Sequence, residues 1–244
     1  MHLRFVGCGD ALGSGGRFNT CFHVSGARVN FLIDCGASSL LALKRLGIAC
    51  DAIDTILITH FHGDHFAGLP FLLLDAQFTR RIRPLTIAGP AGLEQRLHQA
   101  MEALYEHSSQ TQQKFVLNLV TLQPEQPRQL GDLRVTPFPV VHGASGGPFL
   151  AYRIEAEGRT IAYSADTEWT ETLVPAAREA DLFICEAYYY DRIVKNHLSL
   201  TTLEQHLPRI RPKRLILTHM SDDMLARAGS LAYETASDGM TVEL

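Results

Sequence analysis

Three histidines and one aspartate lie within six consecutive residues, inside the stretch Thr59–His65. Imidazole and carboxylate are the side chains that bind zinc and similar divalent ions, and such close spacing lets several of them reach one point. The apolar run Ile56–Ile58 comes directly before them and predicts a buried strand that ends where the polar cluster begins. Gly63 within the cluster would let the backbone turn tightly. We therefore expect a metal site at a strand end, built from His60, His62, Asp64 and His65.

The same arrangement, an apolar run followed by a side chain that can bind metal, recurs four times later in the chain. The side chains concerned are His142, Asp166, Glu186 and His219. Side chains at the ends of several strands commonly converge on one edge of a sheet and build a site there. A single His or Asp at a strand end is more often an ordinary hydrogen-bonded loop residue, but the ordered set is far more specific. We expect these residues to share one site with Thr59–His65.

Strands are predicted by β-branched and aromatic runs between turns, and helices by a period of 3.6 residues. The predicted strands are 3–6, 21–24, 29–34, 53–58, 85–88, 115–122, 133–141, 149–155, 160–164, 181–186 and 215–218, with turns over 123–131. The predicted helices are 38–46, 67–78, 91–106 and 200–207, the last capped by Ser199 or Thr201. Strands and helices mix in both halves without regular βαβ alternation, which favours an α/β layered sandwich over a purely parallel sheet.

Length and composition indicate one globular domain over residues 1–244. The hydrophobic fraction of 46% and charged fraction of 20% are ordinary, and the formal charge of −4 gives no overall attraction to nucleic acid. The first apolar stretch is too short for a signal peptide, and no run reaches the length of a membrane helix. The five cysteines form no CxxC pair and are interpreted as reduced and mostly buried, so we expect a cytoplasmic protein without membrane contact.

Two further stretches could border the predicted site. Five glycines in the eleven positions of Gly7–Arg17 predict a loop, whose backbone amides and Arg17 could hold an anion. The Lys-Ser/Thr ending of a nucleotide-binding P-loop is absent there. The aromatic stretch Tyr188–Tyr190 follows Glu186 and either stacks on a ring of the substrate or packs in the core or an interface.

The ordered set of metal-binding residues resembles that of the metallo-β-lactamase-fold metallohydrolases, over essentially the whole chain. The motif HxHxDH at 60–65 is followed by His142, Asp166 and His219. The resemblance implies a four-layer αββα sandwich of class α/β (α+β) with two metal ions at one edge. One ion would be held by His60, His62 and His142, the other by Asp64, His65 and His219, with Asp166 bridging them. Imidazoles and carboxylates without thiolate suit Zn²⁺, with Mn²⁺ or Fe as alternatives.

The same resemblance implies a mechanism. Two divalent cations about 3.5–4 Å apart lower the pKa of a shared water and hold the oxygens of the substrate, so a metal-bridging hydroxide attacks at neutral pH. Asp64 is placed to orient that hydroxide or accept its proton. The segment 32–36 looks like the family's early aspartate, so Asp34 would support the metal loop from outside.

Three segments resemble the ribonuclease Z-like branch of this superfamily in particular: the opening segment ending at 15–20, the strand 181–187, and Asn196-His197-Leu198-Ser199. In that branch a histidine contacts the scissile phosphate and protonates the leaving oxygen, supported by a glutamate. Carried over, His197 is the candidate general acid and Glu186 its orienting partner, because a carboxylate raises imidazole basicity and fixes its tautomer. The alternative is that His197 is only a structural histidine at a helix start.

One feature departs from ribonuclease Z proper, which carries a long tRNA-binding arm between the positions of His142 and Asp166. The two positions are only 24 apart here (166 − 142), and the predicted strands 149–155 and 160–164, which would form a hairpin around Glu157-Gly158, fill the interval. The sequence therefore predicts a phosphodiesterase for small substrates, such as cyclic nucleotides or cyclic ribose phosphates, rather than for tRNA. Its partner would be a small molecule, with nucleic acid left open, and homodimers occur among the relatives of this branch.

Several other activities remain as alternatives. The same two metals would serve hydrolysis of a lactone, a thioester or an arylsulfate, and ribonuclease Z-type tRNA processing stays open. An iron-dependent oxidoreductase on the same fold is disfavoured by Asp64, because the di-iron branch has a glutamate in the third position of the motif. A non-catalytic interaction module is disfavoured because all seven ligand positions are filled.

Overall fold

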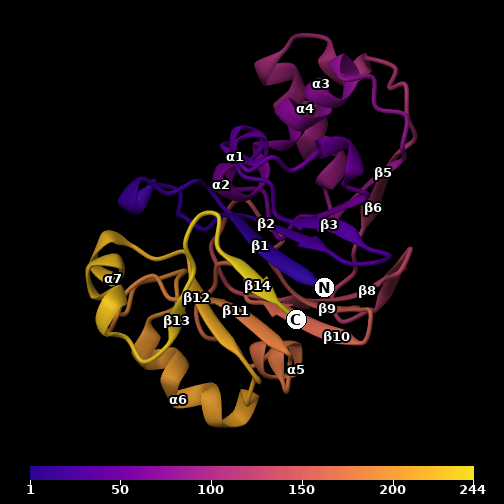
Figure 1. Cartoon of the computed structure of the whole chain (residues 1–244). Coiled ribbons are helices and arrows are strands. Elements are labelled where there is room, and N and C mark those ends of the chain that lie inside the picture. Colours follow the sequence, from indigo (N-terminus) through magenta and orange to yellow (C-terminus); the bar gives the residue numbers. More distant parts are fainter.

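The computed structural model describes all 244 residues, and its strands form two mixed sheets that face each other (Figure 1). The first sheet has the strand order β14-β1-β2-β3-β4-β5-β6. Its strands are β1 (His2–Gly7), β2 (Cys21–Ser25), β3 (Asn30–Ile33), β4 (Thr55–Leu57), β5 (Leu85–Gly89), β6 (Leu117–Thr121) and β14 (Thr241–Glu243). The strands from β14 to β3 pair antiparallel, and those from β3 to β6 pair parallel. β1 and β14 are neighbours, so both chain ends lie at one edge.

The second sheet has the strand order β13-β12-β11-β10-β9-β8-β7. Its strands are β7 (Arg128–Leu130), β8 (Leu133–Pro139), β9 (Leu150–Ala156), β10 (Arg159–Tyr163), β11 (Leu182–Glu186), β12 (Leu215–Thr218) and β13 (Glu234–Thr235). The strands from β7 to β10 are antiparallel, and those from β10 to β13 are parallel. Both sheets therefore contain a run of parallel strands whose carboxyl ends can present loop residues at a shared edge.

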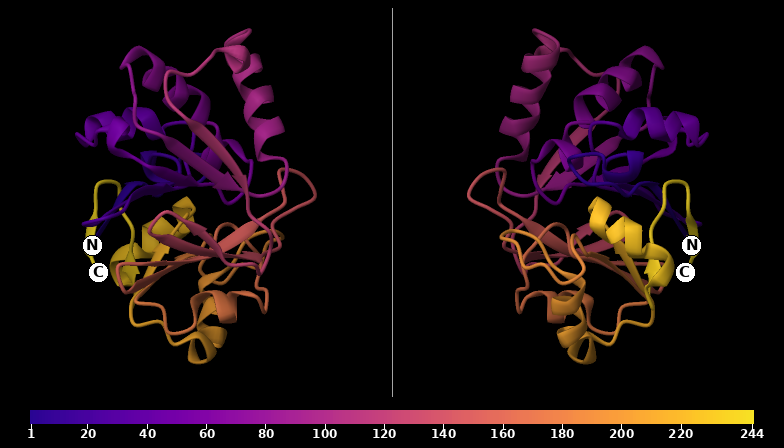
Figure 2. Two further views of the ribbon diagram at one scale, coloured as in Figure 1. Left: turned by 90° about the vertical axis from the view of Figure 1, so that its right-hand side faces the viewer. Right: turned by 90° about the vertical axis from the view of Figure 1, so that its left-hand side faces the viewer.

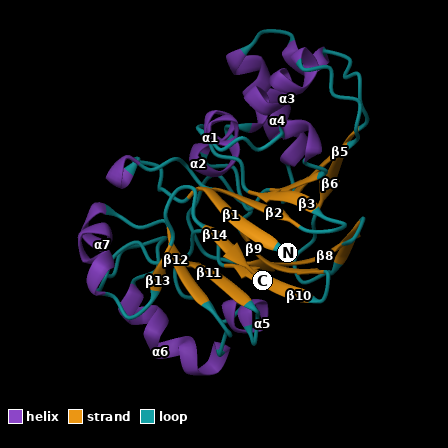
Figure 3. Ribbon diagram, in the orientation of Figure 1, coloured by secondary structure: helices purple, strands orange, loops and turns teal.

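Helices cover the outer face of each sheet (Figures 2 and 3). The first sheet carries α1 (Ser39–Arg45), α2 (Gly63–Phe66), α3 (Leu69–Phe78) and α4 (Leu93–Leu104). The second carries α5 (Leu173–Ala177), α6 (Leu200–Ile210) and α7 (Asp222–Arg227). Short 3-10 helices lie at Ser14–Gly16, Cys50–Ala52, Ser108–Gln110 and Ala228–Ser230. None of the helices combines the length and the apolar character needed to cross a membrane.

Three main apolar clusters correspond to this layering. The largest lies between the sheets and joins side chains such as Phe5 and Phe22 of the first sheet to Tyr152 and Tyr163 of the second. A second cluster packs α1, α3 and α4 on the first sheet, and a third packs α6 and α7 on the second. Burial of this apolar surface is the main favourable term in folding. The predicted four-layer αββα sandwich is confirmed, including its mixed rather than purely parallel sheets.

The structure confirms each predicted strand and helix, with ends that differ by a few residues. Ser199 is the N-cap of α6, and its hydroxyl accepts a hydrogen bond from the Thr202 N–H at 3.3 Å. The prediction of turns over 123–131 was wrong in part, because Arg128–Leu130 pairs with β8 as strand β7. The short elements α2, α5, α7, β13 and β14 were not predicted, since two to six residues are too few to show a period.

Candidate metal centre

Three histidines from the two sheets converge at the ends of β4 and β8. We call His60, His62 and His142 the histidine cluster; one ring nitrogen from each lies within 4.8 Å of the others. The Nδ1 atom of His62 lies 3.2 Å from His60 Nε2 and 3.0 Å from His142 Nε2. His60 and His142 are almost fully buried, and His62 lies at the surface side of the cluster. The sequence spacing thus brings three imidazole nitrogens to one point.

Four further side chains form a second group, the mixed cluster of Asp64, His65, Asp166 and His219. Asp64 and His65 lie on α2, while Asp166 follows β10 and His219 follows β12. The Nε2 atoms of His65 and His219 lie 3.2–3.3 Å from carboxylate oxygens of both Asp64 and Asp166. Asp166 Oδ2 is also 3.6 Å from His142 Nε2, so this one carboxylate reaches both clusters.

The ring nitrogens that face away from these clusters donate hydrogen bonds to fixed acceptors. His60 Nδ1 is 3.0 Å from the Thr59 hydroxyl, and His62 Nε2 is 3.1 Å from the Ser145 carbonyl oxygen. His142 Nδ1 donates to the Asn196 carbonyl oxygen at 2.6 Å. Such bonds fix the tautomer that leaves the other nitrogen free to bind a cation.

Asp34 supports the Thr59–His65 stretch from beneath. Its Oδ2 accepts a hydrogen bond from His65 Nδ1 at 2.7 Å, and its Oδ1 accepts one from the Thr59 backbone N–H at 2.8 Å. The Thr59 hydroxyl also lies against this carboxylate, at 2.9 and 3.0 Å from its two oxygens. Asp34 is fully buried and takes a positive φ of 58°. One aspartate therefore sets both the start of the stretch and the orientation of His65.

Gly63 does not have the role expected of it. It begins α2 without a positive φ, and a Cβ there would meet only the Ala67 Cβ, at 3.8 Å. The close approach is made by Gly36 instead, where a Cβ would collide with the Asp64 carbonyl oxygen. Glycine is required where the β3–α1 loop passes the backbone of α2.

The donor set fits divalent cations. Six buried side-chain polar atoms in the protein lack a hydrogen-bond partner, and three of them are His65 Nε2, Asp166 Oδ1 and His219 Nδ1. Buried polar groups are normally paired, so such a concentration calls for an explanation. His65 Nε2 and Asp166 Oδ1 are donor atoms that a cation would satisfy, and imidazole with carboxylate suits zinc and its neighbours. The structure is therefore consistent with a metal in the mixed cluster.

Burial and neighbouring carboxylates shift the pKa values of the buried histidines in opposite directions. Burial lowers the pKa of His142 to about 4 and lowers that of His60 well below its ordinary value. Burial also acts to lower the pKa of His219, but the carboxylates of Asp166, Asp64 and Glu186 together outweigh it and raise the pKa to about 9. The carboxylates of Asp166, Asp64 and Asp34 likewise raise the pKa of His65 despite its burial. Without a cation His65 and His219 therefore hold protons at neutral pH, while His60 and His142 do not.

His197 and Glu186 form a pair beside these clusters. Glu186, at the end of β11, is fully buried and accepts a hydrogen bond from His197 Nδ1 at 2.9 Å. Its other oxygen accepts the Thr167 backbone N–H. Burial acts to lower the pKa of His197, but the Glu186 carboxylate outweighs it and raises the pKa. The His197 side chain keeps 21% of its surface exposed, so it can reach a bound molecule.

Both clusters and His197 open onto one hollow of about 230 Å³, which we call the site hollow. It is lined by Asp10, Ala11, His62, Asp64, His142, Asp166, Tyr188, Asn196, His197 and His219. The glycine-rich loop thus reaches the site through Asp10 and Ala11. Arg17 turns away instead and donates to the Ala236 carbonyl oxygen at 2.8 Å, so it is not placed to hold an anion there.

Sequence reasoning assigned no role to two residues that the structure brings to the site. Asn196 lies beside His197 with a positive φ of 72°, a conformation in which Asn is enriched, and its carbonyl oxygen holds His142. Asp10 is buried and accepts the Ser14 backbone N–H at 2.9 Å, which shapes the loop at the rim. Asn before a site histidine was the available signal for the first, whereas nothing in the sequence marked the second.

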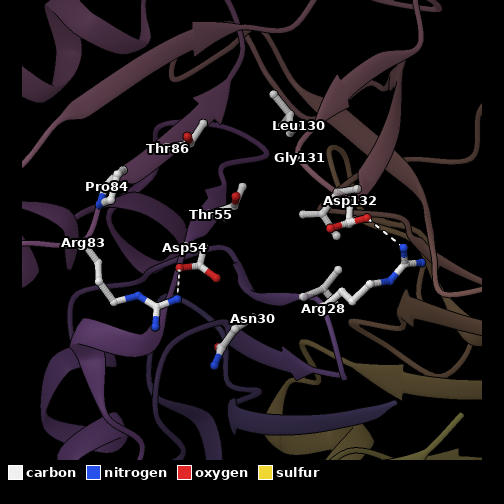
Figure 4. Close-up of a pocket in the computed structure, with 12 residues that line it drawn as sticks. Arg28, Asn30, Asp54, Thr55, Arg83, Pro84, Thr86, Leu130, Gly131 and Asp132 are labelled. Carbon is white, nitrogen blue, oxygen red and sulfur yellow. Dashed lines mark hydrogen bonds and ion pairs between the residues drawn. The ribbon is translucent and has the colours of Figure 1, made fainter.

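Another hollow, of about 320 Å³, lies where β3, β4 and β5 begin (Figure 4). Its charged side chains pair with each other, Arg28 with Asp132 at 3.2 Å and Arg83 with Asp54 at 2.8 Å. It contains no histidine or cysteine and none of the residues of the two clusters. Its side chains offer neither a metal site nor an acid–base pair, so the chemistry belongs to the site hollow.

Comparison with known proteins agrees with this geometry. Ribonuclease Z of Agathobacter rectalis is 29% identical over 247 aligned residues, which cover 80% of each chain. The crystal structure of the short form of human tRNase Z has a TM-score of 0.81 and 26% identity, covering 100% of this chain and 99% of that one. A diphosphatase of the PhnP family has a TM-score of 0.79 at 20% identity, covers 100% of this chain and 97% of that one, and shows likeness in fold.

These likenesses and the His/Asp clusters define the class: a metal-dependent hydrolase of the metallo-β-lactamase fold, in its ribonuclease Z-like group. A model of one family within that class matches residues 1–236. The chain belongs to this family, which is described as anti-Pycsar protein Apyc1.

Proposed function

We propose that this protein is a dinuclear metal-dependent phosphodiesterase that acts on small phosphodiesters, cyclic ones included. The observation that carries the proposal is that the His197–Glu186 pair opens onto the same hollow as the histidine and mixed clusters. Hydrolysis of any ester at this site would use the metals, whereas a positioned acid matters most where the leaving group is a poor one, such as an alkoxide. Relatives named ribonuclease Z and tRNase Z cleave phosphodiesters, which agrees with this reading.

The histidine cluster would hold one metal ion and the mixed cluster the other, with Asp166 shared between them. Its Oδ2 lies 3.6 Å from His142 Nε2 and 3.2–3.3 Å from the Nε2 atoms of His219 and His65, which supports a bridging role. Two divalent ions in such a site lower the pKa of a shared water and neutralise charge on the phosphoryl oxygens. Zinc suits this donor set, with manganese or iron as alternatives.

The protein's own side chains then handle the protons. Asp64 lines the hollow and can orient the attacking hydroxide or take its proton, while its Oδ2 stays 3.2 Å from His219 Nε2. A new P–O bond forms to the hydroxide oxygen as the P–O bond to the leaving oxygen breaks. His197 holds a proton through the effect of Glu186 on its pKa and gives it from Nε2 to that leaving oxygen. Proton transfer by a positioned acid contributes about 10²–10⁴-fold in rate.

The size of the site favours small substrates. The site hollow holds about 230 Å³, and the interval between His142 and Asp166 is occupied by the β9–β10 hairpin, which is part of the second sheet. The interval leaves little chain for an arm that grips tRNA, because Tyr152–Ala156 pairs with Arg159–Tyr163 and only short loops remain on either side. We therefore place cyclic nucleotides and cyclic ribose phosphates before tRNA as substrates.

The test is a substrate panel on protein with defined zinc, manganese or iron content. It comprises bis(p-nitrophenyl) phosphate, 2′,3′- and 3′,5′-cyclic nucleotides, a precursor tRNA, a lactone, a thioester and an arylsulfate. We expect the highest kcat/KM on a cyclic phosphodiester. Faster turnover of the lactone, thioester, arylsulfate or tRNA would assign the protein to the corresponding alternative activity. Oxygen consumption by the iron-loaded protein would indicate an oxidoreductase. Absence of turnover with every metal would refute hydrolysis.

The role of His197 is tested by His197→Ala on the same panel. We expect kcat on a cyclic nucleotide to fall about 10²-fold or more while the metal content stays at two. His98→Ala is the matched control, because His98 is exposed on α4 and is not among the residues that line the site hollow. Equal loss of metal and activity in His197→Ala would instead make His197 a structural residue.

A further inference from the structure

The imidazole of His197 needs more than its hydrogen bond to be a well-placed acid. Glu186 holds only Nδ1, and a bond at one ring atom leaves the plane of the ring free to tilt about that point. Tilting would move Nε2, the atom that faces the substrate, because it lies across the ring from Nδ1. A displacement of about 1 Å in a catalytic group can cost about 10²-fold in rate. Something must therefore hold the face of this ring.

The aromatic ring of Tyr188 lies against that face. The two ring centroids are 4.4 Å apart with an interplanar angle of 22°, which is a stacked arrangement. Two other rings lie near His197: His142 meets it edge-on at 4.9 Å and 74°, and His219 is nearly parallel to it but farther away, at 5.6 Å and 17°. Stacking at this distance fixes the plane of an imidazole, and it also favours a protonated ring through its attraction to the aromatic face.

Tyr188 is itself held firmly at the end of β11. Its backbone N–H donates to the Leu198 carbonyl oxygen at 2.9 Å, and its carbonyl oxygen accepts the backbone N–H and the hydroxyl of Ser221 at 3.1 and 2.5 Å. Tyr188 follows Glu186 by two positions, and the period of an extended chain places such residues on the same side. One strand end therefore supplies both the carboxylate at the edge of the imidazole and the ring on its face.

We propose that Tyr188 is a positioning residue that keeps the His197 imidazole in the plane from which Nε2 reaches the leaving oxygen. This inference rests on the proposed role of His197 as the general acid. The expected signature follows from the chemistry of the leaving group. An alkoxide, such as the ribose oxygen of a cyclic nucleotide, must be protonated as it leaves, whereas p-nitrophenolate leaves without a proton.

The experiment compares Tyr188→Leu and Tyr188→Phe with the unaltered protein, with two metals confirmed in each preparation. On a 2′,3′-cyclic nucleotide we expect Tyr188→Leu to lower kcat about 10-fold or more, since the ring plane is no longer fixed. On bis(p-nitrophenyl) phosphate its kcat should stay within about threefold, because little acid catalysis is used there. Tyr188→Phe keeps the stacking ring and should retain both activities. Should Tyr188→Leu not fold, Tyr188→Met provides the same comparison.

His197→Ala separates failure of this inference from failure of the proposed function. If His197→Ala loses activity equally on both substrates, the general-acid role falls and the inference falls with it. If His197→Ala shows the leaving-group dependence and Tyr188→Leu does not, the positioning role alone is overturned. A rise in the KM of Tyr188→Leu for the cyclic nucleotide with unchanged kcat would mean that Tyr188 binds the substrate. Loss of metal in Tyr188→Leu would mean that Tyr188 has a structural role. Either result also overturns the proposal.

Discussion

Replacing Asp34 with asparagine should weaken metal binding at the mixed cluster without unfolding the protein. Asparagine keeps the shape of aspartate and tolerates the positive φ of 58° at this position. Its carbonyl oxygen can still accept the Thr59 N–H that Asp34 Oδ1 accepts now. Its NH₂ group, however, would face His65 Nδ1, where two donors would meet at the present distance of 2.7 Å.

The conflict resolves when the His65 proton moves from Nδ1 to Nε2. Nε2 is the atom that lies 3.3 Å from Asp64 and Asp166, so the proton would then occupy the position at which a cation is expected. Loss of a carboxylate partner of this kind typically costs 10–100-fold in metal affinity, or about 1.4–2.7 kcal/mol. The histidine cluster keeps all its hydrogen-bond partners, so we expect its affinity to change little.

Competition with a chelator measures this effect, with metal content counted by mass spectrometry. Asp34→Asn should bind one zinc ion with unaltered affinity and a second one about 10–100-fold more weakly, with a matching loss of activity at limiting zinc. Asp181→Asn is the matched control, because Asp181 also accepts a backbone N–H, that of Thr160 at 2.8 Å, at the opposite end of β11. Two tightly bound ions in Asp34→Asn, or an equal loss in Asp181→Asn, would refute the reasoning.

Two further predictions follow from the site and its loops. His65 and His219 have raised pKa values, about 9 for His219, so both are protonated at pH 7 in the metal-free protein. The protein should therefore release about two protons when it binds zinc at pH 7, and its apparent affinity for zinc should rise with pH. Calorimetry in buffers of different ionisation enthalpy counts these protons, and zero release at pH 7 would contradict the charge assignment. Gly36→Ala should destabilise the fold by about 1–3 kcal/mol, whereas Gly63→Ala should be neutral or slightly stabilising. Thermal melting compares the stability of the two variants. Equal melting temperatures would contradict the prediction, because they would mean that the backbone near Gly36 shifts to accommodate a Cβ.

Local signals were sufficient for much of the fold. Apolar runs of four to eight residues predicted the central strands, and a clear 3.6-residue period predicted α4 and α6. The segments that were missed depend on tertiary contacts instead. β7 forms because Arg128–Leu130 pairs with β8 across a tight turn, and β14 forms because the chain end returns beside β1. Neither segment has a pattern of its own.

The clusters follow from topology as well as from residue types. Ligand-type residues at the ends of β4, β10 and β12 meet because those strands are parallel members of their sheets and end at one edge. The contact between Tyr188 and His197 could not be predicted in this way. It depends on the path of the segment after β11, which returns so that Leu198 pairs with Tyr188. Both residues were identified as candidates from the sequence, but their stacking depends on the path of the chain between them.

Glu186 joins the proposed acid to the proposed metal centre, and this limits what a mutation there can reveal. One of its oxygens accepts the N–H of Thr167, directly after Asp166, and the other holds His197 and lies 4.0 Å from His219 Nδ1. A fully buried carboxylate needs these partners, and removing it leaves several donors unpaired at once. Glu186→Gln would therefore disturb the mixed cluster together with the acid. The Tyr188 ring contacts the imidazole face at a centroid distance of 4.4 Å and lies farther, at 5.9 Å, from the ring of His219. A change of this side chain therefore alters the placement of the proposed acid while the hydrogen bonds of Glu186 and of the mixed cluster stay in place.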